Sequence, residues 1–118
     1  MKEEEKFFKL KVWEKAHKIT LKIYKITETY PRNELYGLVS QMRRASVSVV
    51  ANIVEGTKRQ TSNDRKHFYV MSDTSLEELK YYIILGNDLK YLSKTVAEEL
   101  VEDMREIGRM LNGLKKCQ

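Results

Sequence analysis

The chain has 118 residues, enough for one domain and too few for two, so we expect residues 1–118 to form a single domain. One proline and five glycines disfavour a turn-rich all-β chain, and a net charge of +5 permits an anionic partner without requiring one. The single cysteine, Cys117, excludes an internal disulfide and fits a reducing cytoplasm. The charged start MKEEEKFFKLKVW lacks a signal-peptide core, and no apolar run approaches the ~20 residues of a membrane span. We therefore expect a cytoplasmic protein with no membrane segment.

The first expected helix covers residues 12–29. Its apolar side chains are spaced alternately four and three residues apart, the period of one helix face: Val12, Ala16, Ile19, Ile23, Ile26 and Tyr30. Pro31 ends this helix, because the residue before a proline is driven out of the α region.

The second expected helix covers residues 34–55, with Asn33 as a plausible N-cap and Gly56 just after its end. The segment SVSV at 46–49 alternates like a strand, but only over four residues. A spacing of three and four residues continues over about five turns and favours a helix. The residues on that face are Leu35, Leu38, Met42, Ala45, Val49 and Asn52.

Two further helices are expected at residues 63–88 and 94–114. Each repeats the same spacing, the third through Tyr69, Ser72, Leu76, Leu79 and Ile83, and the fourth through Leu100, Met104, Ile107, Leu111 and Leu114. Four amphipathic helices joined by short links predict an all-α protein with the antiparallel up-down four-helix bundle fold.

Polar residues of the second helix lie where they need partners. Asn52 falls on the core face, so we expect it to bond to another helix. Glu55 lies near the helix C-terminus, where the macrodipole disfavours an anion. Arg43 is about 18 Å away along the same helix, so the partner of Glu55 is expected on another helix or another chain. Small residues beside them, Ala45, Ser46, Ser48 and Ala51, allow close approach of a helix or of a neighbouring subunit.

Arg43 and Arg44 stand at the height of Glu77 and Glu78 in an antiparallel bundle. Two interpretations stay open with similar weight. At least one arginine pairs with those glutamates or with an acid of a neighbouring subunit, or the two arginines face a nucleic acid.

Five lysines of the first helix form one stripe beside its core face: Lys11, Lys15, Lys18, Lys22 and Lys25. The ordinary interpretation is that their stems cover apolar surface while their charges point outward. The alternative is a surface that follows nucleic-acid phosphates, joined by Lys58 and Arg59 at the loop after the second helix.

Motifs for catalysis or cofactor binding are absent. His17 and His67 lie outside any HExxH or CxxC motif, and Cys117 has no base nearby in the sequence. There is no GxxxxGK[ST] or GxGxxG pattern, and the Glu-x-x-His pattern occurs once, at Glu14 and His17, without the second copy that a di-iron bundle site uses. We expect no metal, no cofactor and no enzymatic activity.

The stretch RRASVSVVANIVEG at 43–56 resembles the RRA-x-x-S-[IV]-P-A-N-I-A-E-G signature of the 23S rRNA intervening-sequence proteins, also called S23 proteins. KVWEKAHKITLKIYKITETYP resembles the first helix of that family, ELYGLVSQMRR the start of its second, and SLEEL and DLKYL its third. The resemblance covers residues 10 to about 92. Val50 departs from a common proline, and Thr74 and Lys90 depart from glycine or another small residue.

The resemblance implies a homopentamer of four-helix bundles without established enzymatic activity. It also implies a relation to the accessory variability protein of diversity-generating retroelements, which works with a reverse transcriptase and binds nucleic acid. Two functions are therefore expected as alternatives. One is an oligomeric accessory protein that binds RNA or DNA weakly and without strong base preference. The other is a protein-interaction scaffold with no nucleic-acid role.

Overall fold

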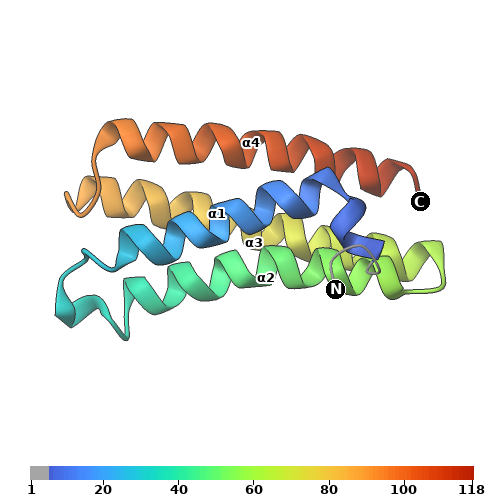
Figure 1. Cartoon of the computed structure of the whole chain (residues 1–118), viewed down its shortest axis with the longest axis horizontal. Coiled ribbons are helices and arrows are strands. Elements are labelled where there is room, and N and C mark those ends of the chain that lie inside the picture. Colours follow the sequence, from blue (N-terminus) through green and yellow to red (C-terminus); the bar gives the residue numbers. More distant parts are fainter. Residues whose placement is uncertain (1–5) are drawn as a thin grey trace.

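The computed structural model describes residues 6–118 and confirms the all-α antiparallel four-helix bundle (Figure 1). The helices are α1 (Lys11–Thr27), α2 (Leu38–Lys58), α3 (Ser62–Asp88) and α4 (Lys94–Lys116). Short 3-10 turns, η2 (Lys6–Lys9) and η3 (Arg32–Glu34), precede α1 and α2. The part of the chain from residue 6 onward contains no strand, and none of its helices is long and apolar enough to span a membrane.

The four helices form a square in cross-section. α2 packs on α1 and α3, and α4 packs on α3 and α1. One end of the bundle holds the starts of α1 and α3 and the ends of α2 and α4, and the other end holds the reverse (Figure 1). The side of the square between α1 and α2 is therefore opposite the side between α3 and α4.

The core follows the expected helix faces. Ile23, Met42, Leu79, Ile83 and Met104 are fully buried, one or two from each helix, and the other apolar residues of the four faces surround them. Burial of each such side chain stabilises the fold by about 1.5–3 kcal/mol. Apolar residues spaced three and four apart can all be buried together only on one face of a helix, so this spacing predicted the helices.

The start of α2 differs from the expected residue 34, because η3 ends at Glu34 and residues 35–37 form a turn before the helix. Gly37 precedes the helix with φ −113° and ψ −111° and has no side chain to cap it. The carboxylate of Glu34 takes that role, since its Oε1 accepts the N–H of Leu38 at 3.3 Å. Asn33 is thus not the N-cap of α2. At α3 and α4, Thr61 and Ser93 accept the N–H groups of Asp64 and Val96.

Small and polar residues join α2 closely to α3. Ser72 Oγ donates to the carbonyl of Val49 at 2.7 Å, and the hydroxyls of Ser48 and Ser75 bond at 2.8 Å. Gly56 lies against the ring of Tyr69, so that an added Cβ would come within 2.5 Å of Tyr69 Cε1. The small residues of the second helix therefore serve an interface within this chain.

Candidate nucleic-acid interface

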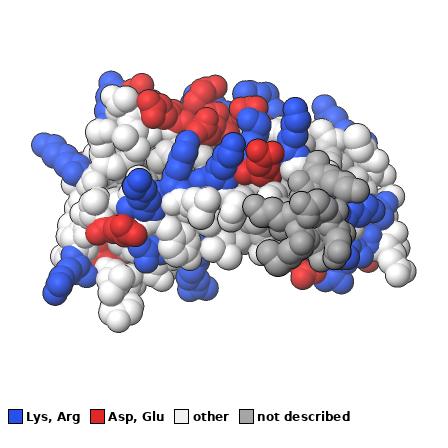
Figure 2. Space-filling model, in the orientation of Figure 1, with Lys and Arg blue, Asp and Glu red and all other residues white. Residues whose placement is uncertain are grey.

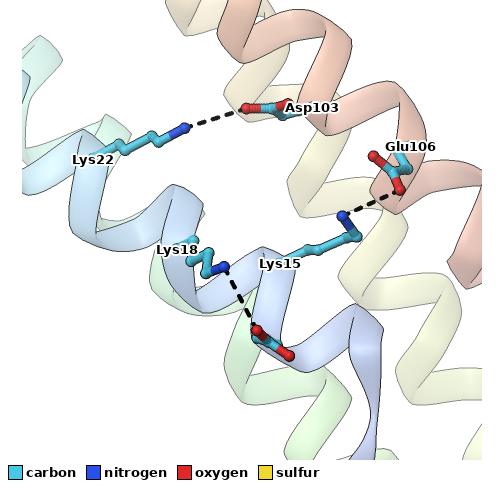
Figure 3. A network of polar contacts seen from close by, with 6 residues as sticks. Lys15, Lys18, Lys22, Asp103 and Glu106 are labelled. Atoms are coloured by element: carbon cyan, nitrogen blue, oxygen red, sulfur yellow. Dashed lines mark hydrogen bonds and ion pairs between the residues drawn. The ribbon is translucent and has the colours of Figure 1, made fainter.

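Three lysines of the expected stripe form ion pairs with acids (Figure 3). Lys15 Nζ lies 3.2 Å from Glu106 Oε1 and Lys22 Nζ lies 3.4 Å from Asp103 Oδ2, both across to α4. Lys18 Nζ lies 3.5 Å from Glu14 Oε1, one turn earlier on α1. The paired side chains are 42–66% exposed, so each pair contributes at most about 1 kcal/mol.

The acids of α4 change the charge of the stripe. Figure 2 shows basic side chains along α1 beside acidic side chains along α4. Asp103 and Glu106 are three residues apart and share a helix face. That spacing, together with the antiparallel order, was the available signal for these pairs. Lys11 and Lys25 are exposed and have no ion pair within residues 6–118.

A second set of cations lies where α1 and α3 begin and α2 and α4 end. We call this end of the bundle, with its exposed cations, the basic end. The cations of this set are Lys11, Lys58, Lys66, Arg109 and Lys116. Within the described part of the chain, none of them forms an ion pair. Lys58 and Lys116 also lie in the last turns of α2 and α4, where positive charge stabilises the helix dipole.

Two arginines hold the turn between α2 and α3 in place. Arg59 lies 2.9 Å from Glu55 and its guanidinium covers the ring of Phe68 at 4.4 Å. Arg65 donates to the carbonyls of Arg59 and Gln60 and to the side chain of Gln118. Within one chain the basic partner of Glu55 is therefore Arg59, four residues later, rather than a residue of another helix. The expected pairing with a neighbouring subunit stays a prediction.

Arg43 faces α1 rather than α3. Its Nε donates to Thr27 Oγ1 at 3.0 Å, its Nη2 donates to the carbonyl of Tyr24 at 3.3 Å, and it lies 4.8 Å above the Tyr24 ring. Among residues 6–118, neither arginine forms an ion pair with Glu77 or Glu78, and Glu77 instead pairs with Lys80 at 2.5 Å. Arg44 is exposed. The expected pairing with a neighbouring subunit stays a prediction.

Asn52 is buried but does not bond directly to another helix. Its Nδ2 donates to the carbonyl of Ser48 at 2.9 Å and to Ser48 Oγ at 3.1 Å, one turn earlier on α2. Ser48 carries the link onward to Ser75 of α3. The expected bond between helices exists, but Ser48 makes it.

The histidines and the cysteine lie at the surface. His17 is exposed and its ring stacks on Trp13 at 5.0 Å, and His67 contacts Phe68 at 5.4 Å. Cys117 is exposed just after α4. Residues 6–118 contain no group of three His, Cys, Asp or Glu side chains arranged to hold a metal ion.

The model of one protein family, described as "23S rRNA-intervening sequence protein", matches residues 8–113. The chain belongs to this family. A crystal structure of a protein of unknown function from the S23 ribosomal protein family of Bacteroides thetaiotaomicron VPI-5482 superposes with a TM-score of 0.80 and 22% identity. The superposition covers 89% of this chain and 98% of that one, and it supports the fold alone. A comparison with curated proteins finds no match.

Family membership gives the signature stretch at 43–56 a structural meaning. Arg43 ties α2 to α1, Asn52 organises Ser48, and Gly56 admits the Tyr69 ring. The Ser46 carbonyl accepts the hydroxyl of Thr20 at 3.2 Å. These residues of the signature thus hold α2 between its two neighbours.

Proposed function

We propose that this member of the 23S rRNA-intervening sequence protein family is a non-enzymatic, oligomeric accessory protein of the cytoplasm. In this proposal it binds RNA or DNA through phosphates, without strong base preference. The observation that carries the proposal is the group of exposed cations at the basic end that have no acidic partner among residues 6–118.

The contrast between the two sets of cations favours the basic end over the lysine stripe. To bind a phosphate, each of Lys15, Lys18 and Lys22 must break its ion pair with a carboxylate. The exposed cations Lys58, Lys66 and Lys116 release only water and counterions. Lys11 and Arg59 also lie at the basic end. Lys25 lies at the opposite end of α1, away from the other cations without ion pairs.

A salt titration with matched variants tests this proposal. Replacing Lys58, Lys66 and Lys116 with glutamine is expected to reduce the slope of log affinity against log salt on duplex DNA by up to about 2.7. Glutamine is nearly as good a helix former as lysine, so the bundle should persist. The matched control replaces Lys15, Lys18 and Lys22 with glutamine and should change the slope less. No binding of RNA or DNA at low salt would refute the proposal. A larger change of the salt slope in the control variant would place the binding site on the lysine stripe instead.

A protein-interaction scaffold is the second candidate function. Exposed apolar side chains gather around a hollow between α1 and α2, with Tyr36 93% exposed. A reverse transcriptase or another protein would then be the partner. Retained binding of a protein partner by a variant that no longer binds nucleic acid would favour this candidate.

A further inference from the structure

Three aromatic rings follow one another at the start of α1. Phe7 of η2 lies 5.4 Å from Trp13, with an angle of 53° between the ring planes. Trp13 lies 5.0 Å from His17, and these two rings are nearly parallel, at 11°. Trp13 is half-buried and packs against the hydrophobic core, so the pair has a fixed base. We call Trp13 and His17, four residues apart on one helix face, the ring stack.

His17 is the outer ring of the stack. Its side chain is exposed, and among residues 6–118 it forms no hydrogen bond, no ion pair and no ring contact other than the one with Trp13. An exposed imidazole with one face on an indole offers its second face to a ligand. The chemical group that fits such a face is a planar ring, which would extend the stack by one member.

The ring stack lies among the cations of the basic end, because α1 begins there (Figure 1). Lys11 is exposed and has no ion pair within the described chain, and it precedes His17 by six residues, about 9 Å along the helix. Lys18 follows His17 directly. The nearest acid in the sequence, Glu14, pairs with Lys18 at 3.5 Å, so its charge is offset. A planar ring beside positive charge is the combination that binds a base together with its phosphate.

Other exposed rings lack one half of this combination. His67 also lies at the basic end, but its ring meets that of Phe68 at 75°, so the two form no flat stack. Tyr36 and Tyr81 are exposed, but they lie toward the opposite end of the bundle, before the start of α2 and in the second half of α3. The ring stack has both a flat exposed ring and neighbouring cations.

From this arrangement we infer that the basic end takes single-stranded RNA or DNA, with one unpaired base stacked on His17 and the adjoining phosphates on Lys11 and the neighbouring cations. In a duplex each base is covered by its neighbours and must first be unstacked. In a single strand the base faces are available to a protein ring. This inference rests on the function proposed above and names the form of nucleic acid that the same site binds.

Strands that differ only in their bases test the inference on the wild-type protein. The probes are a short thymidine strand, an abasic strand with the same number of phosphates, and a duplex of equal length. At one salt concentration, the thymidine strand should bind at least about fivefold more tightly than the abasic strand, because stacking adds to the attraction of the phosphates. It should also bind more tightly than the duplex, although the duplex carries more charge. Tighter binding of the duplex would overturn the preference for single strands.

Substitution of His17 tests the location of the stacked base. His17→Leu keeps Trp13 covered but removes the flat ring, so it should lower the affinity for the thymidine strand toward that for the abasic strand. His17→Tyr keeps a flat ring and should retain the affinity. The matched control is His67→Leu, the same change at an exposed histidine of the same end, and it should leave the affinity unchanged. Circular dichroism should show that these surface variants keep their helices.

The fluorescence of Trp13, the chain's one tryptophan, gives a measurement that does not depend on a variant. A base added to the ring stack should reduce its emission, so the thymidine strand should quench it and the abasic strand should not. The same quenching by both strands would overturn the inference.

The outcomes separate the inference from the function on which it rests. No binding of any strand at low salt overturns both. Equal affinities for the thymidine and abasic strands overturn the stacked base and leave phosphate binding at the basic end standing. Equal losses of affinity in His17→Leu and His67→Leu likewise overturn the role of the ring stack alone.

Discussion

Tyr91 donates a hydrogen bond to Glu34, with 3.0 Å between its hydroxyl and Oε2, and so joins the turn between α3 and α4 to the start of α2. The other oxygen of the same carboxylate accepts the N–H of Leu38 at 3.3 Å. The bond to Glu34 raises the pKa of the Tyr91 hydroxyl. One carboxylate thus caps a helix and ties two distant turns together.

Replacing Glu34 with alanine should lower the free energy of unfolding by about 1–2 kcal/mol, because α2 loses its cap and Tyr91 loses its acceptor. Glu34→Gln keeps one acceptor oxygen for the Leu38 N–H, and its amide N–H can donate to the Tyr91 hydroxyl, so it should lose less. Chemical denaturation of the two variants checks this order. Equal stability of Glu34→Ala and wild type would contradict it.

Tyr30 is buried, and its hydroxyl has no hydrogen-bond partner among residues 6–118. Tyr30→Phe should therefore leave stability at neutral pH unchanged or raise it by up to about 1 kcal/mol. Burial, and to a lesser extent Tyr91, raises the pKa of Tyr30 to about 12. The unfolded chain ionises this group near pH 10, so its contribution is fully present below that pH and is lost as the pH rises toward 12. Tyr30→Phe should lose less stability than wild type across this range, as urea titrations at each pH can measure.

Gly56 and Gly113 form a matched pair of helical glycines. Gly56→Ala should destabilise by about 1–2 kcal/mol, because the contact with the buried Tyr69 ring outweighs the better helix propensity of alanine. Gly113 has nothing within 4 Å of an added Cβ, so Gly113→Ala should stabilise by about 0.5–1 kcal/mol. Opposite shifts in melting temperature are the expected result, and a stabilised Gly56→Ala would refute the close packing.

Lys90 has a φ of 65°, in the left-handed region that favours glycine. It follows α3 and is one of the two positions where the family resemblance implies glycine or another small residue. Lys90→Gly should raise stability by about 0.5–1 kcal/mol, because a Cβ is disfavoured in this conformation. Calorimetry can measure the shift, and Lys94→Gly, within the first turn of α4, should shift stability the opposite way.

Asp103 and Glu106 hold two lysines of the stripe. Asp103→Asn with Glu106→Gln should change stability by less than about 1 kcal/mol, because the pairs are exposed. The same change frees Lys15 and Lys22, so the salt slope on duplex DNA should steepen by up to about 1.8 if both then bind phosphates. An unchanged slope would show that the stripe takes no part in binding even when its lysines are free.

Sequence periodicity was sufficient for the bundle because burial of one face per helix dominates its energetics. Local polar contacts were harder to predict. Glu55 pairs with Arg59, which lies beyond the expected end of the second helix. The second helix begins at Leu38, where the Glu34 carboxylate caps it. The lysine stripe could be predicted from the sequence. Its ion pairs with Asp103 and Glu106 could be predicted only with the knowledge that α4 lies beside it. Arg43 was expected near α3 from its height along the bundle alone. Height does not determine which neighbouring helix a side chain faces, and Arg43 faces α1.

The exposed thiol of Cys117 lies at the basic end and is the chain's one cysteine. A maleimide dye would therefore attach at a single defined position without any engineered residue. Arg65 holds the neighbouring Gln118 against the turn after α2, so the dye would report from a fixed part of the surface. If the copies assemble as proposed, energy transfer between the dyes would follow assembly and nucleic-acid arrival in the same sample.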